Sequence, residues 1–229
     1  MSKIHLKWNL LAPFEELDKH KDELSVGGVY LWIFSGKPER IAYIGESMNV
    51  GERHVSHFSF LISGRYVVYP VPPEREDYLS FINDYICGRD LKVIKSDKII
   101  YPYGYTDEHF TFSRFVSKKQ YQVCRDYLQR LKFAVAKIED NDERKSTEAI
   151  LLLGIRRAYA KELKVDEKQL RGLSGRSDHT LFGRLSKYPK DNSTFTISHE
   201  GIYKDKLPTE ITNITEFPFP PVKDGTSSK

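Results

Sequence analysis

The sequence predicts an α+β fold: a small core with a three-stranded mixed or antiparallel sheet flanked by helices, and a large helical and aromatic insertion. An apolar, β-rich run at 29–34 is followed by turn residues at 35–38 and a second apolar run at 41–45, which is the pattern of a β-hairpin. Apolar residues alternate with lysines over 131–138, which predicts a third strand. Helical patterns after the second and third strands complete the order hairpin, helix, strand, helix.

Composition limits the classes of protein that fit this chain. Its 229 residues are enough for one large domain or two small ones, with 39% hydrophobic and 30% charged residues. The sequence has no apolar run long enough to span a membrane, and charges interrupt its first eight residues where a signal peptide would be apolar. Cys87 and Cys124 have no metal-like spacing. We therefore expect a cytoplasmic protein with reduced thiols and no membrane contact.

The first segment is expected to be helical. Over 4–24, Phe14, Leu17 and Leu24 form a narrow apolar stripe after Pro13. This segment has no residues that suggest chemistry, so we expect it to pack on the domain that follows.

The hairpin is followed by a helix that carries two candidate functional residues. Ser47 or Asn49 is suited to cap the first free amides of this helix. Arg53 and His57 are four residues apart, so they share one helix face. The neighbouring His54 points elsewhere and is expected at the surface.

The segment 61–130 separates this helix from the third strand. It contains 13 of the 29 aromatic residues of the chain, with 11 basic and 9 acidic residues. Prolines interrupt it, and helices are expected near 74–87 and 117–130. Such an insertion would serve to read base edges, stack bases or form a dimer contact, or its aromatic residues would simply form a second small core.

The C-terminal part of the chain is basic. A helix is predicted to begin at Ser146-Thr147-Glu148 and to run to about Leu163, followed by a loop over 171–178 and a tail from Gly201 that frays at its end. Residues 144–190 include 12 Lys or Arg and 5 Asp or Glu, a balance of +7 that leaves −3 for the remainder. This excess favours contact with nucleic acid phosphates, although a solvated helix face with unpaired lysines would give the same pattern.

Two triplets lie in register on the predicted hairpin. Gly28-Val29-Tyr30 and Tyr43-Ile44-Gly45 leave twelve residues between the two tyrosines, and Gly45-Glu46-Ser47-Met48-Asn49 leads to Arg53 and His57. With Glu148 on the later helix, this order resembles the GIY-YIG nuclease family over about 27–60 and 131–160. The resemblance implies hydrolysis of phosphodiester bonds with one divalent cation.

The roles can be argued from the residue types. Glu148 offers hard oxygen ligands for one Mg²⁺, for which Mn²⁺ would substitute, with Glu143 and Glu139 as nearby rivals. Arg53 presents a planar fork to the scissile phosphate. In the family the first tyrosine is the usual general base, so the resemblance assigns Tyr30 to deprotonate or orient the attacking water. The resulting catalytic set is Tyr30, Tyr43, Arg53, His57 and Glu148, with Tyr43 as a ligand of the phosphate or water and His57 either hydrogen-bonded to the phosphate or assisting Tyr30.

Each of these residues also has a purely structural interpretation. The tyrosines fit half-buried strands, Arg53 fits a helix surface, His57 fits a packed position beside Phe58, and a carboxylate in the first turn of a helix is favoured by the helix dipole. The chain also departs from the family, in which many members carry an asparagine about a dozen residues after the metal ligand. Ala160 stands there, and Asn192 is the substitute that the sequence offers.

The insertion favours one branch of the family. A stand-alone nuclease with such an insertion resembles the type II restriction endonucleases, whose cutting of palindromic double-stranded DNA needs two active sites and hence a homodimer or a transient pair. A structure-specific repair or mobile-element nuclease and a non-catalytic nucleic-acid-binding protein on the same scaffold are the alternatives. The candidate DNA contacts are Asn49, Arg156, Arg157, Arg171 and Arg176. The predicted domains are 1–26 as an N-terminal helical segment, 27–60 with 131–165 as the catalytic core, 61–130 as the insertion, and 166–229 as a basic loop region and tail.

Overall fold

A computed structural model describes residues 3–62, 118–167, 178–185 and 194–218. Its elements in chain order are β1 (Lys3–Pro13), η1 (Phe14–Lys19), α1 (Lys21–Leu24), β2 (Gly28–Phe34), β3 (Arg40–Ser47), α2 (Val50–Ile62), α6 (Lys118–Gln129), β4 (Leu131–Lys137), α7 (Asn141–Leu163), α8 (Asp178–Leu185), β5 (Thr194–Glu200), η3 (Lys204–Lys206), α9 (Thr209–Thr212) and β6 (Glu216–Pro218). The fold is α+β, as the sequence predicts.

The sheet is larger than predicted. It has six strands in the order β3-β2-β4-β1-β5-β6 instead of three. The predicted strands β2, β3 and β4 pair antiparallel at one end. Strand β1 continues this sheet antiparallel to β4, while β5 lies parallel to β1 and β6 antiparallel to β5. The result is a mixed sheet in which β3 is an edge strand.

The prediction of a helix over 4–24 is wrong for its first half, because residues 3–13 form β1. Every second side chain of β1 is buried, at Ile4, Leu6, Trp8, Leu10 and Ala12. This period of two is the signature of a strand. Only the second half is helical, in the two short pieces η1 and α1.

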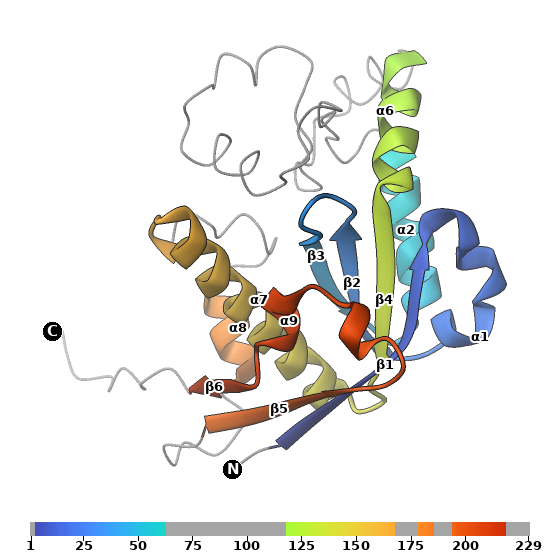
Figure 1. Ribbon diagram of the computed structural model, residues 1–229. Coiled ribbons are helices and arrows are strands. Elements are labelled where there is room, and N and C mark those ends of the chain that lie inside the picture. Colours follow the sequence, from blue (N-terminus) through green and yellow to red (C-terminus); the bar gives the residue numbers. More distant parts are fainter. Residues whose placement is uncertain (1–2, 63–117, 168–177, 186–193, 219–229) are drawn as a thin grey trace, which may run out of the picture.

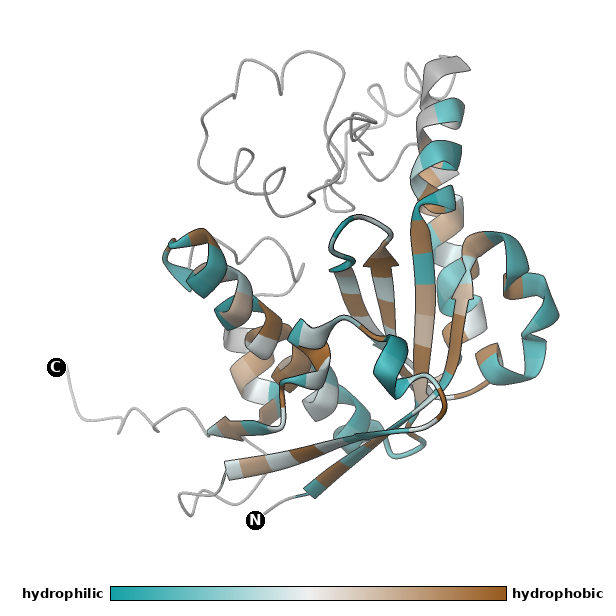
Figure 2. Cartoon of the chain, viewed as in Figure 1, coloured by the Kyte–Doolittle hydropathy of each residue, from teal (hydrophilic) through white to brown (hydrophobic). Residues whose placement is uncertain are grey.

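Helices cover both faces of the β3-β2-β4 region (Figure 1). Helices α2 and α6 lie on one side of it, with η1 and α1, and α7, α8 and α9 lie on the other. All seven residues of β2 are buried, as expected for a central strand covered on both faces. Figure 2 shows the same layering in hydropathy, with apolar colours along β2 and β4 and hydrophilic colours on the η1–α1 connection.

Helix α7 begins earlier than predicted. Asp140 is its N-cap and accepts a hydrogen bond from the backbone N–H of Glu143 at 2.7 Å. Glu148 is therefore the eighth residue of α7 rather than part of its first turn. The helix dipole therefore does not explain a carboxylate at this position, because its effect falls off within the first turn.

The C-terminal region contains more regular structure than the loop and tail predicted from 166 onward. Residues 178–218 supply α8, β5, α9 and β6. Strand β5 buries Phe195, Ile197 and His199 alternately, a pattern of period two within a region expected to be loop. The predicted helix at 117–130 is confirmed as α6, whereas the one at 74–87 lies outside the described residues.

No helix in the described ranges combines the length and the apolar character needed to cross a lipid bilayer.

Candidate active site

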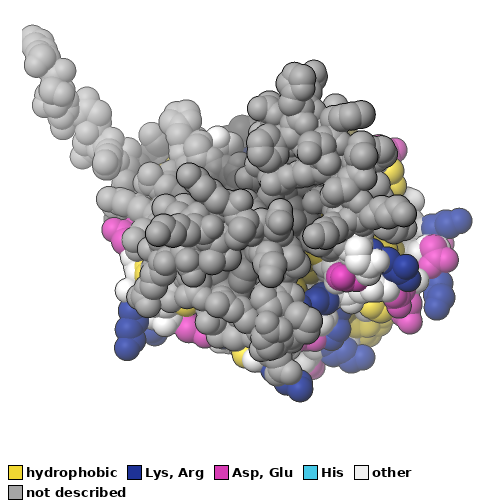
Figure 3. Space-filling model, turned by 90° about the horizontal axis from the view of Figure 1, so that it is seen from above, with side chains coloured by type: hydrophobic (Ala, Val, Ile, Leu, Met, Phe, Trp, Pro, Cys, Tyr) yellow, Lys and Arg dark blue, Asp and Glu magenta, His cyan; other side chains and the backbone are white. Residues whose placement is uncertain are grey.

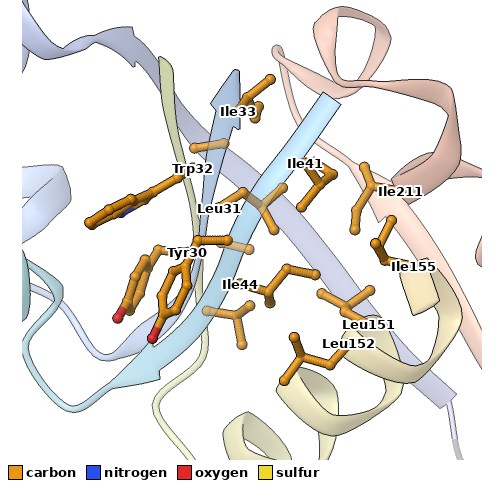
Figure 4. Packing of buried hydrophobic residues seen from close by; sticks show 14 of the residues in the cluster. Tyr30, Leu31, Trp32, Ile33, Ile41, Ile44, Leu151, Leu152, Ile155 and Ile211 are labelled. Carbon is orange, nitrogen blue, oxygen red and sulfur yellow. The ribbon is translucent and has the colours of Figure 1, made fainter. Parts of the chain in front are cut away.

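Strand register puts the aromatic residues of both triplets on one face of the sheet. Tyr30 lies opposite Gly45 and Trp32 opposite Tyr43, and alternate residues of a strand share a face. In Figure 4, Tyr30 and Trp32 project to one side of β2 and β3, while Leu31, Ile44, Leu151 and Ile155 pack on the other. The two triplets therefore present their tyrosines to the side covered by α2.

Helix α2 brings a histidine to the first tyrosine. The Tyr30 hydroxyl lies 2.9 Å from His57 Nε2, and a hydrogen bond in which the phenol donates fits a neutral imidazole. The Tyr30 and Tyr43 rings lie 5.8 Å apart between centroids, and the His57 ring lies 5.3 Å from that of Tyr43. All three side chains are at most 6% exposed. The structure therefore brings together the predicted Tyr30, Tyr43 and His57.

Arg53 completes this cluster electrostatically. Burial raises the pKa of Tyr30 well above its usual value of 10.0, and the neighbouring Tyr43 raises it further. The positive charge of Arg53 and its hydrogen bond to Tyr30 act in the opposite direction. Arg53 therefore stabilises negative charge on the Tyr30 oxygen. Its guanidinium lies next to this oxygen, which in the resemblance deprotonates or orients the attacking water.

Both histidines of α2 are buried and neutral. Burial lowers the pKa of His57 to about 3, with further lowering by Arg53, and burial lowers the pKa of His54 to about 4. The prediction that His54 lies at the surface is wrong, because it is 2% exposed and packs against Tyr30 with 4.7 Å between ring centroids. Its Nδ1 donates to the Val50 carbonyl at 2.8 Å.

The buried histidines predict a loss of stability in acid. In the unfolded chain each would titrate near 6.5, so below that pH the unfolded state binds protons that the native state excludes. The free energy of unfolding therefore falls as the pH drops from about 7 toward 4. For His54 we expect a fall of about 2 kcal/mol between pH 7.5 and 5.

Urea unfolding at pH 7.5 and at pH 5 tests this expectation. The control is His54→Phe, which fits the surrounding aromatic rings and cannot titrate. We expect a smaller difference between the two pH values for the variant than for the wild type. Equal differences would mean that His54 accepts a proton in the folded protein.

Gly45 allows the Tyr30 ring to cross the neighbouring strand. A Cβ at this position would collide with Cζ and Oη of Tyr30 and would lie 2.8 Å from Cε1 of Tyr43. The glycine of the second triplet is thus explained by close packing of the first tyrosine. It fixes the tyrosine in front of α2.

This contact predicts that Gly45→Ala displaces Tyr30 and lowers the free energy of unfolding by about 1–3 kcal/mol, as for other overpacked sites. Gly183→Ala is the matched control, because nothing lies within 4 Å of a Cβ built on Gly183. In α8 that change is expected to be neutral or to stabilise by up to about 1 kcal/mol. Urea titration of both variants measures the difference, and equal stabilities would contradict the packing argument.

Glu148 lies in a separate cluster of charges on the α7 side of the sheet. It is fully buried, and its Oε2 forms an ion pair with Nη1 of Arg184 from α8. Nη2 of the same guanidinium lies 3.3 Å from Oε1 of Glu46. Oε2 of Glu46 in turn accepts from Nε of Arg144 at 3.0 Å. The four side chains alternate in charge, which a buried group of ions requires.

This network lies on the other face of β3 from the tyrosine cluster. Glu46 follows Gly45, so the two residues face opposite sides of an edge strand. Arg144, which is 2% exposed, is held by the carbonyl of Glu139 at 3.3 Å and by Oδ1 of Asn141 at 3.0 Å. The predicted catalytic residues thus form two clusters on opposite faces of β3, with Tyr30, Tyr43 and His57 on the α2 side and Glu148 on the α7 side.

Glu46, Arg144 and Arg184 were missed as site residues from the sequence. No local pattern links them, because Glu46 and Arg184 are separated by 138 positions. Only the packing of α8 on α7 brings Arg184 to Glu148.

The donor set suits one hard divalent cation only in part. Among the residues that the structure describes, no cluster of three or more His, Cys, Asp or Glu side chains is arranged to hold a metal ion. Glu148 nevertheless is a buried carboxylate that already attracts a cation, the Arg184 guanidinium. A single carboxylate with water in the remaining positions is a chemically acceptable Mg²⁺ site. The rivals Glu139 and Glu143 differ from it, since neither is buried.

The candidate DNA contacts fall into three groups. Asn49 uses its Oδ1 to cap α2, accepting from the backbone N–H of Glu52 at 3.1 Å. Arg156 is 4% exposed, which argues against the predicted contact with a DNA backbone. Arg157 is 41% exposed and lies over the Phe217 ring at 4.5 Å, so it stays a candidate. Arg171, Arg176 and the proposed substitute Asn192 lie outside the described residues.

Some of the basic side chains that make up the positive excess of the C-terminal region lie in the interior and not at the surface. Arg144, Arg156 and Arg184 are buried or paired with carboxylates. In the view of Figure 3, the described surface carries Lys or Arg and Asp or Glu side chains interspersed. Net charge alone therefore overestimates the surface available to phosphates.

Comparison of the chain with family models, with curated proteins and with solved structures found no match.

Proposed function

We propose that this protein is a DNA endonuclease that hydrolyses phosphodiester bonds with one divalent cation. The observation that carries the proposal is the cluster in which Tyr30 donates to His57 while Arg53 and Tyr43 border the same hydroxyl. A phosphoryl transfer site needs a group to orient water and a cation to face the phosphate. The resemblance to the GIY-YIG nucleases rests on the same side chains.

His57, Tyr30 and Arg53 each have a separate role in the proposed hydrolysis. Neutral His57 accepts a hydrogen bond from the Tyr30 hydroxyl, so a lone pair of the Tyr30 oxygen can accept a hydrogen bond from the attacking water. Because the pKa of His57 is about 3, the imidazole orients the phenol and does not store a proton. Arg53 binds a nonbridging phosphate oxygen and stabilises the negative charge that grows there.

Glu148 is the residue that would hold the cation. When bound there, Mg²⁺ would add positive charge at the phosphate and at the leaving oxygen. In the balanced reaction, water forms the new P–O bond, the bond to one sugar oxygen breaks, and one water proton passes to that leaving oxygen through the site. The tyrosines and Arg53 lie on the α2 side of β3 and Glu148 on its α7 side, so a scissile phosphate would have to reach both clusters around this edge strand.

Two refinements belong to the same proposal. The substrate we favour is double-stranded DNA, cut at a short sequence by a type II restriction mechanism in which two copies of the chain act on two strands. Specificity would come from 61–130 and from basic residues such as Arg157. Repair of branched DNA and cutting by a mobile element are the alternatives within the same chemistry.

One observation favours a different class of function. The ion pair between Glu148 and Arg184 occupies a carboxylate oxygen that a metal ion would need. A nucleic-acid-binding protein without catalysis would be stable in that state. This second candidate predicts binding of duplex DNA with no cleavage.

Incubation of the full chain with mixed-sequence duplex DNA, with Mg²⁺ or with EDTA, separates these functions. Discrete fragments that share a short palindromic end would support the restriction activity. Cuts confined to flaps, forks or branches would replace restriction by repair or by a mobile-element role. Binding without any metal-dependent cut would refute the nuclease and leave the binding protein.

A further inference from the structure

Arg184 holds an unusual position for a surface-helix arginine. Its side chain is 14% exposed and one guanidinium contacts two carboxylates, those of Glu148 and Glu46. Helix α8 is fixed by Leu181 and Leu185, both fully buried. The Arg184 carbonyl also accepts from the Ser146 hydroxyl at 3.3 Å. The backbone of α8 is thus anchored, so a change of partner would involve the Arg184 side chain alone.

The two carboxylates are not equivalent. Glu148 is buried in the middle of α7, with a side chain that is 1% exposed. Glu46 lies at the end of an edge strand and has a second cationic partner, Arg144, at 3.0 Å. Glu46 can therefore retain Arg184 after a change at Glu148, because its own position is fixed by Arg144.

A metal ion and Arg184 compete for the same carboxylate. A divalent cation needs a carboxylate oxygen in direct contact, and Oε2 of Glu148 is bonded to the guanidinium. Two positive charges held a few ångströms apart near the protein interior repel strongly. A metal ion on the other carboxylate oxygen of Glu148 would still lie beside the guanidinium, so each cation weakens the binding of the other.

We propose that Arg184 is a built-in counter-ion that neutralises Glu148 until a divalent cation displaces its guanidinium onto Glu46. The proposal rests on the proposed function, because it takes Glu148 as the metal ligand, and it adds a control step to that site. In the metal-free protein the buried charge of Glu148 is compensated. On metal binding, the Arg184 guanidinium keeps only its contact with Glu46 while the α8 backbone stays in place.

Binding of Mn²⁺ to the full-length chain without DNA, measured by calorimetry, tests this control step. The main variant is Arg184→Gln, which removes the competing charge at similar length, and we expect its dissociation constant for Mn²⁺ to fall by about tenfold or more. Arg184→Lys keeps the charge and should stay within about threefold of the wild type. Glu46→Gln removes the second partner of Arg184 and should weaken Mn²⁺ binding.

Lys145→Gln is the matched control, because Lys145 is a basic residue of α7 one turn before Glu148. A general loss of positive charge would make it resemble Arg184→Gln, and that outcome would overturn a specific role of Arg184. Weaker or unchanged Mn²⁺ binding by Arg184→Gln would also overturn it, as would absence of Mn²⁺ binding in every variant. If Arg184→Gln folds poorly, the weaker Mn²⁺ binding expected of Glu46→Gln still tests the proposal. Unchanged or tighter Mn²⁺ binding by Glu46→Gln would overturn it.

The readout separates this inference from the nuclease proposal. A chain that never cuts DNA but shows the expected order of Mn²⁺ affinities would support the counter-ion and refute the nuclease. A chain that cuts DNA with Mg²⁺ while Arg184→Gln binds Mn²⁺ no more tightly would keep the nuclease and refute the counter-ion.

Discussion

Replacing Glu148 by Gln is expected to lower the rate of DNA cleavage by about 10³-fold or more while duplex binding persists. The change removes the negative charge that would hold the cation but keeps the side-chain shape and an oxygen that accepts from Arg184. Without the bound cation, the transition state loses several kcal/mol of charge stabilisation, and the activation free energy rises by that amount. Single-turnover cleavage of a labelled duplex and a gel-shift titration measure the two properties.

Controls for this variant lie near Glu148 in the chain. Glu143→Gln and Glu139→Gln change carboxylates that are not buried and are expected to cut as the wild type does. Normal cutting by Glu148→Gln together with loss in either control would move the metal ligand to the rival residue. Loss of both binding and cutting in Glu148→Gln would point to a damaged fold, which urea unfolding of the same sample would reveal.

Replacing Tyr30 by Phe is expected to lower the cleavage rate by about 10²–10⁴-fold, the range for removal of a group that handles the proton of the attacking water. The ring still packs over Gly45 and the strand pairing is unchanged. Only the hydroxyl that reaches His57 at 2.9 Å is lost. The free energy of unfolding should therefore fall by only about 1 kcal/mol. A large fall in rate with a small fall in stability assigns the hydroxyl to catalysis.

Tyr43→Phe is the matched control for this change, because it removes a second hydroxyl from the same face of the sheet. Its effect on cleavage should be smaller if Tyr43 only binds phosphate or water. The pH profile adds a second readout: the pKa values of His57 and His54 are about 3 and 4, so neither produces a break near 6.5. Cutting by Tyr30→Phe at the wild-type rate would remove Tyr30 from the mechanism.

Predictions from local patterns were reliable where the neighbours of a residue lie close in sequence. The hairpin of β2 and β3, the strand β4 and the helices α2 and α7 were predicted from turn residues, alternation and apolar spacing. A contact of His57 with Tyr30 was one of the two alternatives expected for this histidine, and the 2.9 Å contact is present. Strand β1 shows the limit of local patterns, because its alternation of apolar and polar residues lies next to the apolar stripe of 14–24, which favours a helix.

Residue types and spacing in the sequence predicted the α+β class, the paired triplets and the helix that carries Arg53 and His57. Tertiary structure decided the environment of Glu148, because Glu46, Arg144 and Arg184 come from three distant segments that meet only when α7 and α8 pack beside β3. The physical reason is range: periodicity and capping act within a few residues, whereas compensation of a buried charge depends on whichever segments the core brings together. Glu148 is a candidate from its place in the chain, but its counter-ion is a property of the folded molecule.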